Sequence, residues 1–142
     1  MIQMDVNLLI YAYDPRSAYH DRARDWLEAA FREQPRIGLA WSTVLAFLRI
    51  TTNPRSARPA SLADAVRIVN DWLSLDAVIL LHPGERHWSI LSGLLISAQA
   101  RGPLVPDAHL AALAIEHGAV LCTNDRDFTR FPGLRVQYPL EG

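Results

Sequence analysis

The sequence predicts an α/β fold in which a mostly parallel sheet of four to five strands lies between two layers of helices, a three-layer α/β/α arrangement. Two observations predict it. Short apolar runs alternate along the chain with longer stretches in which apolar residues recur every three or four positions. Half of the 142 residues are hydrophobic and a fifth are charged, so the chain can cover both faces of a sheet. Since no long polar linker interrupts residues 1–142, we expect one domain.

The expected elements alternate in type from one end of the chain to the other. Strands are predicted over residues 1–4, 36–39, 77–81, 119–122 and 134–137. Helices are predicted over residues 7–13, 18–32, 41–51, 62–73, 83–100 and 107–117. Strands that alternate with helices favour parallel pairing, because each helix carries the chain back to the same end of the sheet.

Helix boundaries follow from residues that start or stop helices. Asp14-Pro15 stops the first helix and Asn53-Pro54 follows the third, because proline disfavours a helical residue before it. Ser61 is a typical N-cap for the fourth helix. Gly102-Pro103 breaks the fifth helix, and Gly118 ends the sixth because glycine readily adopts the left-handed conformation.

Three of the helices have a clear apolar face. Over 18–32 that face consists of Ala23, Trp26, Leu27, Ala30 and Phe31. In the helix capped by Ser61 it consists of Leu62, Ala65, Val66, Val69 and Leu73, and over 83–100 of Trp88, Leu91, Leu94, Leu95 and Ala98. Each of these helices is therefore expected to pack on the sheet along one side.

Three aspartates lie at the ends of predicted strands or at the start of a predicted helix. Asp5 ends the opening strand, Asp107 starts the last long helix, and Asp125 follows the strand over 119–122. In open α/β sheets, ligands bind at the carboxyl ends of the strands. Carboxylates that converge there repel one another unless a cation holds them, which points to a hard metal ion such as Mg²⁺.

Each aspartate also has an ordinary explanation. Asp107 after Pro106 resembles a helix start with an acid that compensates the helix dipole, and Asp125 resembles an Asx-turn residue. Asp5 is harder to explain in this way, because it lies between Met4 and Val6 in an apolar run, where an unpaired carboxylate is costly. The three together favour a functional site.

Short motifs around these aspartates resemble a known family. Asp5-x-Asn7-x-Leu9-Ile10-x-Ala12 is similar to the opening motif of PIN-domain proteins, and the segments 107–114 and 123–128 are similar to their central and C-terminal acidic motifs. The order and spacing resemble those of VapC toxins of type II toxin–antitoxin systems. The segments 47–55, 83–88 and 131–134 resemble one VapC subgroup, so the resemblance spans essentially residues 1–140.

The resemblance implies a Mg²⁺-dependent endoribonuclease, with Mn²⁺ as a possible substitute, that a cognate antitoxin neutralises. It implies structured RNA such as tRNA or rRNA as the substrate. Asp5, Asp107 and Asp125 would be the catalytic, metal-binding residues, with Asp125 on a second metal or a metal-bound water. Two other roles stay open. Asn7 either orients Asp5 or a metal-bound water through its amide, or stabilises a turn. Asp127 either assists the metal site or has a solvated or capping role.

One position departs from the family pattern. Many PIN domains carry a glutamate in the helix after the second strand, and the equivalent residue here is Ala46. The site is then formed by three aspartates, or Asp127 takes the place of the missing glutamate. Whether the site binds one metal ion or two stays open. The alternative is a degenerate, non-catalytic PIN fold that binds RNA or protein. Ser42 and Thr43 on the same helix either contact metal-bound waters or serve as polar residues at a helix start.

Charge and composition restrict the remaining possibilities. The net charge of −1 does not itself indicate nucleic-acid binding. All 14 basic residues are arginine, which suits phosphate recognition but also follows from a GC-rich genome; Arg49 and Arg55 are the candidates for RNA contact. A phosphatase or phosphoacceptor domain is disfavoured, since it needs a lysine. The single Cys122 excludes an internal disulfide. The spacing of the histidines is not that of zinc ligands, which applies to His82, His87, His109 and His117. His109 is expected on a helix surface.

Location and assembly complete the expectations. No apolar stretch reaches the ~20 residues of a membrane span, and Asp5 interrupts any signal-peptide pattern, so a cytoplasmic protein without a membrane partner is expected. The high apolar fraction suggests hydrophobic surface for a homodimer or an antitoxin segment.

Overall fold

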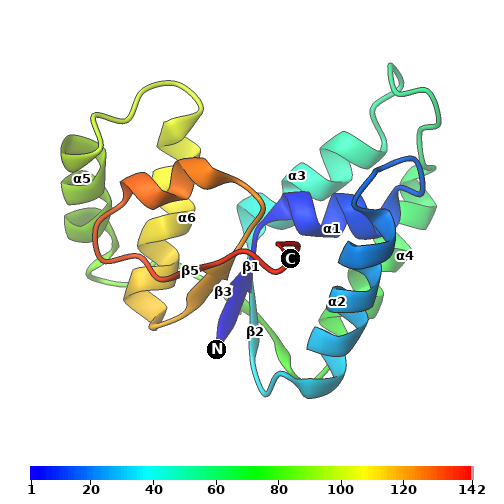
Figure 1. Cartoon of the computed structure of the whole chain (residues 1–142), viewed down its shortest axis with the longest axis horizontal. Coiled ribbons are helices and arrows are strands. Elements are labelled where there is room, and N and C mark those ends of the chain that lie inside the picture. Colours follow the sequence, from blue (N-terminus) through cyan, green and yellow to red (C-terminus); the bar gives the residue numbers. More distant parts are fainter. Residues whose placement is uncertain (142) are drawn as a thin grey trace.

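The computed structural model describes residues 1–141, and its elements follow the predicted alternation of strands and helices. The strands are β1 (Ile2–Met4), β2 (Ile37–Ala40), β3 (Val78–Leu81), β4 (Val120–Cys122) and β5 (Val136–Gln137). The helices are α1 (Val6–Tyr13), α2 (His20–Glu33), α3 (Trp41–Thr51), α4 (Leu62–Leu73), α5 (His87–Ser97), α6 (Leu104–His117) and the 3-10 helix η1 (Arg126–Arg130). Figure 1 shows their arrangement.

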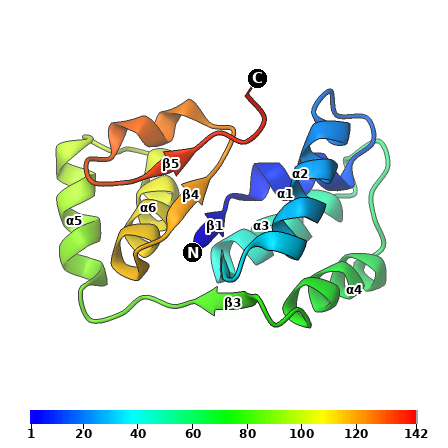
Figure 2. The ribbon, with the colours of Figure 1, turned by 60° about the horizontal axis from the view of Figure 1, so that its bottom comes forward.

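The five strands form one sheet in the order β3-β2-β1-β4-β5, and every neighbouring pair is parallel. The N-terminal strand β1 therefore lies at the centre, between β2 and β4 (Figure 2). The carboxyl ends of these three strands lie side by side, because Met4 pairs with Cys122 and β2 runs in the same direction. The predicted fold class is confirmed.

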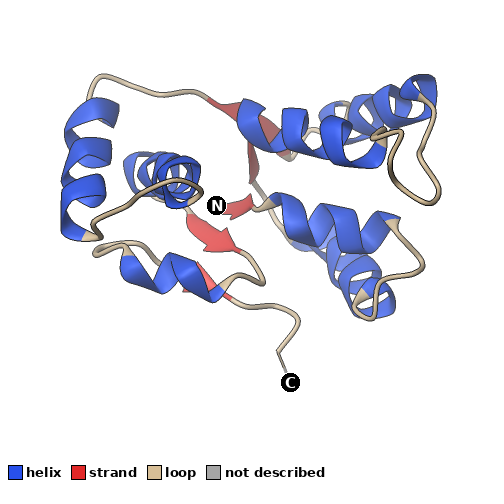
Figure 3. Ribbon diagram, turned by 90° about the horizontal axis from the view of Figure 1, so that it is seen from above, coloured by secondary structure: helices blue, strands red, loops and turns tan. Residues whose placement is uncertain are grey.

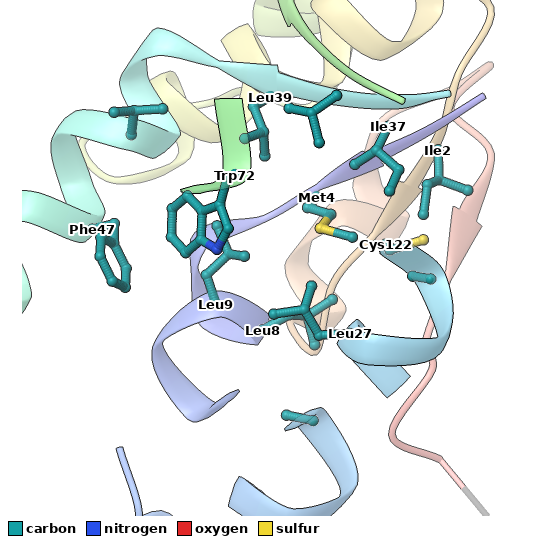
Figure 4. Close-up of a cluster of buried hydrophobic side chains, with 14 of the residues drawn as sticks. Ile2, Met4, Leu8, Leu9, Leu27, Ile37, Leu39, Phe47, Trp72 and Cys122 are labelled. Atoms are coloured by element: carbon teal, nitrogen blue, oxygen red, sulfur yellow. The ribbon is translucent and has the colours of Figure 1, made fainter. Parts of the chain in front are cut away.

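Helices cover both faces of the sheet (Figure 3). One face packs against α1, α2, α3 and α4, and the other packs against α5, α6 and η1. The alternation along β1 explains the two layers: Ile2 and Met4 join the core beneath α1 and α2 (Figure 4), whereas Gln3 points the other way and donates a hydrogen bond to the Leu110 carbonyl of α6 at 3.2 Å.

The start of α4 and the end of α6 lie where the sequence predicts them. Ser61 caps α4, with its hydroxyl accepting a hydrogen bond from the Asp64 N–H at 3.1 Å. Gly118 ends α6 with a φ of 67°, a conformation that costs glycine little.

Two helix starts differ by three residues or more from the predictions. The helix predicted over 83–100 is shorter, because the backbone N–H groups of Gly84 and Arg86 bond to the side chain of Glu116 before α5 begins. The helix predicted from Asp107 begins three residues earlier, at Leu104. Pro106 is tolerated there, because residues of a first turn have no partner within the helix for their N–H groups.

The C-terminal region differs as well. The 3-10 helix η1 was not predicted, and β5 contains only Val136 and Gln137 of the four residues predicted for it. Both elements depend on contacts with β4 and α6, which local patterns do not reveal. No helix within residues 1–141 is long and apolar enough to cross a membrane.

Candidate metal centre

Asp5 lies at the junction between β1 and α1. Its N–H still takes part in the sheet, donating to the Cys122 carbonyl at 3.0 Å, and its carboxylate accepts the N–H of Val6, the first residue of α1, at 2.7 Å. Only 7% of the residue is exposed. The chain thus turns from strand to helix at a buried carboxylate in the middle of the sheet.

Thr123 holds this carboxylate from the neighbouring strand. The Thr123 hydroxyl donates to Asp5 Oδ2 at 2.8 Å, and it accepts from the Asp125 N–H at 3.0 Å and from Asn7 Nδ2 at 3.2 Å. Its one donor and two acceptor positions are therefore all used. No role was predicted for Thr123 from the sequence, although its place between β4 and Asp125 is a signal that could have found it.

Asn7 lies beside Asp5 and contacts both Asp5 and the loop that follows β4. Its Nδ2 is 3.3 Å from Asp5 Oδ2, and its Oδ1 accepts the Asn124 N–H at 3.4 Å. The amide therefore connects the first turn of α1 to the loop after β4. Asn7 therefore contacts the Asp5 carboxylate directly.

Asp107 approaches Asp5 from the first turn of α6. The two carboxylates line a cavity of about 150 Å³, together with Val6, Ser42, Thr43, Ala46, Pro106 and Leu110. These residues lie at the start of α1 and in the first two turns of α3 and α6. The cavity lies at the carboxyl edge of the sheet, where parallel α/β folds bind their ligands.

The pKa values of both carboxyls are raised. Burial raises the pKa of Asp5, opposed by the hydrogen bonds from Thr123 and Val6, and the Asp125 charge raises it further. Burial raises the pKa of Asp107 to about 6, with added repulsion from Asp125, Asp5 and Asp127. The carboxylates are therefore close enough to repel one another, and a cation among them would relieve that repulsion.

Asp125 and Asp127 lie beside this pair without lining the cavity. Asp125 caps η1, with its Oδ1 accepting the Asp127 N–H at 2.9 Å, so it also performs the turn role that its local sequence suggests. Asp127 is exposed and lies 4.0 Å from Arg130. Both nonetheless contribute to the negative potential at Asp107.

The donor set suits a hard cation. Carboxylate oxygens are the preferred ligands of Mg²⁺, which keeps several waters and is commonly held by only one or two carboxylates. In the part of the chain that the structure describes, no three His, Cys, Asp or Glu side chains are grouped closely enough to enclose a metal ion. The residues present therefore fit a hydrated Mg²⁺ held by Asp5 and Asp107 better than a closed protein cage.

The part of the cavity wall that α3 forms carries no acid. Ala46 lies there, at the position where the family pattern places a glutamate. Thr43, from the first turn of α3, is only 2% exposed, and its hydroxyl has no hydrogen-bond partner among residues 1–141. The wall formed by α3 is therefore neutral, whereas the wall formed by α1 and α6 is acidic.

The two arginines predicted to contact RNA lie at the far end of α3. Arg49 is in its last turn, Arg55 is in the turn that follows, and both are exposed. A cavity of about 320 Å³ is also on this side and is lined in part by Asp14, Arg16 and Arg58. Its only acid, Asp14, is paired with Arg16 at 3.0 Å, so it offers no free carboxylates for a metal.

A second polar cluster joins α5 to α6. Glu116 accepts the N–H groups of Gly84 and Arg86 at 2.8 and 3.0 Å, and His87 Nε2 lies 3.0 Å from His109 Nδ1. A Cβ at Gly84 would lie 2.6 Å from Glu116 Oε2, so this approach requires glycine. The expectation that His109 lies on a helix surface is wrong, because α5 packs over it. This cluster explains the motif over 83–88 as a structural connection.

Comparison with known proteins places the chain in a family. The model of the PIN domain matches residues 2–134. Ribonuclease VapC37 of Mycobacterium tuberculosis is 39% identical over 137 residues, which cover 96% of this chain and 95% of that protein. Ribonuclease VapC33 of the same species is 40% identical over 141 residues, covering 99% of each protein.

Solved structures share the fold. VapBC2 from Rickettsia felis, bound to a DNA fragment from its promoter, matches with a TM-score of 0.70 and 18% identity, over 96% of this chain and 98% of that one. The Mycobacterium tuberculosis toxin VapC20, described as cleaving the sarcin-ricin loop, matches with a TM-score of 0.68 and 16% identity, over 95% and 99% of the two chains.

The parallel sheet, the acidic cavity at its carboxyl edge and the full-length similarity to VapC proteins agree with one another. The chain belongs to the PIN-domain family and, within it, to the VapC group.

Proposed function

We propose that this protein is an endoribonuclease that requires Mg²⁺ and acts as the toxin of a type II toxin–antitoxin system. The observation that carries the proposal is the pair of carboxylates in the cavity: Asp5, buried at the end of the central strand, and Asp107, with a pKa raised to about 6. A pair of this kind at the carboxyl edge of a sheet is a costly arrangement that a divalent cation stabilises.

The chemistry of phosphodiester hydrolysis matches this site. When bound, Mg²⁺ would neutralise charge on phosphate oxygens and lower the pKa of a coordinated water. Asp5 and Asp107 would hold the ion, Asp125 would add negative potential beside it, and Thr123 and Asn7 would keep Asp5 in place. The site also excludes bulk water on the Asp5 side, where the carboxylate is buried.

The relatives favour the enzyme over a non-catalytic module. Proteins 39 and 40% identical to this chain are named ribonucleases, and VapC20 is described as a toxin that cleaves the sarcin-ricin loop. We therefore propose structured RNA as the substrate. The absence of a glutamate at Ala46 leaves two carboxylates in the cavity wall, which supports one metal ion rather than two and a weaker metal affinity.

A protein antitoxin and a second copy of the chain are the proposed partners. Related structures are described as VapBC and toxin–antitoxin complexes, which supports the antitoxin. Large apolar side chains are exposed on four helices: Trp41 and Leu45 on α3, Leu62 and Val66 on α4, Trp88 and Ile96 on α5, and Val105 on α6. Light scattering at micromolar concentration tests the homodimer, and a monomer under those conditions would contradict it.

The decisive test compares Asp5→Asn with the wild type in an RNA cleavage assay. Sequencing of RNA ends after induction should show new, Mg²⁺-dependent cleavage sites with the wild type and none with Asp5→Asn. Glu28→Gln, which removes one exposed negative charge on α2, serves as the control and should cleave normally. Cleavage by Asp5→Asn at the wild-type rate would refute the proposal.

A further inference from the structure

Two arginines line a cavity at the far end of α1 and α3, away from the metal centre. This cavity of about 320 Å³, which we call the arginine cavity, is formed by Tyr13, Asp14, Pro15, Arg16 and Arg58. All of these residues except Pro15 also line a narrower cavity of about 60 Å³. The two cavities therefore adjoin each other, between the end of α1 and the turn that follows α3.

The charges in the arginine cavity leave donors free for an anion. Asp14 occupies two of the five N–H donors of Arg16, because its Oδ1 lies 3.0 Å from Nε and its Oδ2 lies 3.1 Å from Nη2. The guanidinium of Arg58 forms no hydrogen bond or ion pair with any residue in the range 1–141. One carboxylate thus faces two guanidiniums, so the cavity keeps an excess of positive charge.

The surface between the arginine cavity and the metal centre carries no charge. The helices α1 and α3 lie side by side, and both begin at the carboxyl edge of the sheet (Figure 1). Val6 and Ala46 line the cavity of the metal centre, and Ile10 and Ile50, each one turn further along its helix, line the cavity of about 60 Å³. The whole of α1, from Val6 to Tyr13, is about 10 Å long at 1.5 Å per residue. A glutamate in place of Ala46 would add a negative charge to this surface.

A chain of phosphates fits both ends of this surface. Arginine suits phosphate, because its planar guanidinium forms two parallel hydrogen bonds with phosphate oxygens. The acidic end accepts a phosphate once a divalent cation lies between the carboxylates and the anion. Uncharged, partly exposed side chains between them suit the bases and sugars of a single strand. Every nucleotide of RNA carries a phosphate, so one short segment can reach both ends.

We propose that the arginine cavity binds a backbone phosphate of the RNA strand whose scissile phosphate lies at the metal centre. Arg58 is the principal donor and Arg16 the second, and the strand follows the uncharged surface of α1 and α3 between the two sites. The proposal rests on the proposed function for the identity of its ligand. Neither Arg49 nor Arg55, which the sequence suggests as RNA contacts, lines the cavity.

The test measures RNA binding under conditions in which Mg²⁺-dependent cleavage does not occur. The full-length protein is titrated in EDTA into a fluorescein-labelled single-stranded octauridylate, and the anisotropy gives the affinity at several salt concentrations. Arg58→Gln should weaken binding about fivefold to tenfold, the loss expected when hydrogen bonds to a charged group disappear. The slope of log affinity against log salt should become shallower by about 0.7, the value for one lost phosphate contact on a single strand.

Arg36→Gln is the matched control. Arg36 is also exposed and belongs to no ion pair among the residues that the structure describes, 1–141, but it precedes β2, at the opposite edge of the sheet from the metal centre. This variant removes the same charge and should bind the RNA within about twofold of the wild type, because salt screens distant charges. Both variants should unfold at the wild-type temperature, since neither side chain is buried, so a loss confined to Arg58→Gln is a loss of binding.

Three results would overturn the proposal. Equal RNA affinity in Arg58→Gln and Arg36→Gln would show that the cavity does not bind RNA. A salt slope unchanged by Arg58→Gln would show that no phosphate contact is lost. Unchanged affinity for RNA with lost affinity for a hexaglutamate peptide would assign the cavity to an acidic protein segment. Failure of the ribonuclease proposal is distinguishable, since it appears as wild-type protein that binds the RNA and does not cleave it when Mg²⁺ is added.

Discussion

Replacing Asp107 by Asn should make the metal-free protein more stable and inactive at the same time. Asp107 has a pKa of about 6 in the folded chain against an ordinary value of 3.8, chiefly because of burial. Its ionised form is therefore better tolerated in the unfolded chain. The cost to the folded state is absent below pH 3.8, grows as the pH rises, and is fully present above about pH 6.

The size of the effect follows from the same values. The gap between 3.8 and about 6, at 1.36 kcal/mol per pH unit, sets an upper limit of about 3 kcal/mol. Because Asp107 is only half buried, solvent screening reduces the expected gain to about 1 kcal/mol. For a chain of this length that corresponds to an increase in Tm of about 3–4 °C.

The assay is thermal or urea unfolding with EDTA, at pH 7.5 and at pH 4, for the wild type, Asp107→Asn and the surface control Glu28→Gln. The stability difference between Asp107→Asn and the wild type should be near 1 kcal/mol at pH 7.5 and should shrink at pH 4. Added Mg²⁺ should stabilise the wild type and not the variant. A variant that is less stable than the wild type at pH 7.5 without metal would refute the reasoning.

Three further predictions concern the same site and its supports. The apparent Mg²⁺ affinity measured by calorimetry should fall as the pH drops below about 6, because protons compete for Asp107; a constant affinity from pH 7.5 to pH 5 would contradict this. Thr123→Val should weaken Mg²⁺ binding, because the lost hydrogen bond allows the pKa of Asp5 to rise further, and should cost roughly 1–3 kcal/mol of stability. Gly84→Ala should lower the Tm, since its Cβ would lie 2.6 Å from a carboxylate oxygen of Glu116. Gly93→Ala has open space in α5 and should raise the free energy of unfolding by roughly 0.5–1 kcal/mol. Equal effects of the two substitutions would show that the close approach at Gly84 is unimportant.

The fold class and the approximate positions of the strands were predictable from the sequence, because both depend on local patterns. Short apolar runs and the three-to-four-residue spacing of apolar side chains are properties of neighbouring residues. Gly118 and Ser61 also act locally, so one helix end and one helix start were placed correctly. The start of α5 could not be placed, because it depends on the Glu116 side chain from another helix.

For the site, the sequence by itself determined which carboxylates stand at strand ends. Asp5 and Asp107 were identifiable because an acid beside an apolar run or in the first turn of a helix is a local feature. Only the tertiary structure showed that these two line the cavity while Asp125 caps η1 beside it. Only the tertiary structure revealed the hydroxyl of Thr123 as the connection to Asp5, 118 residues away in the chain. Periodicity describes each element alone, whereas burial and hydrogen bonding depend on which elements pack together.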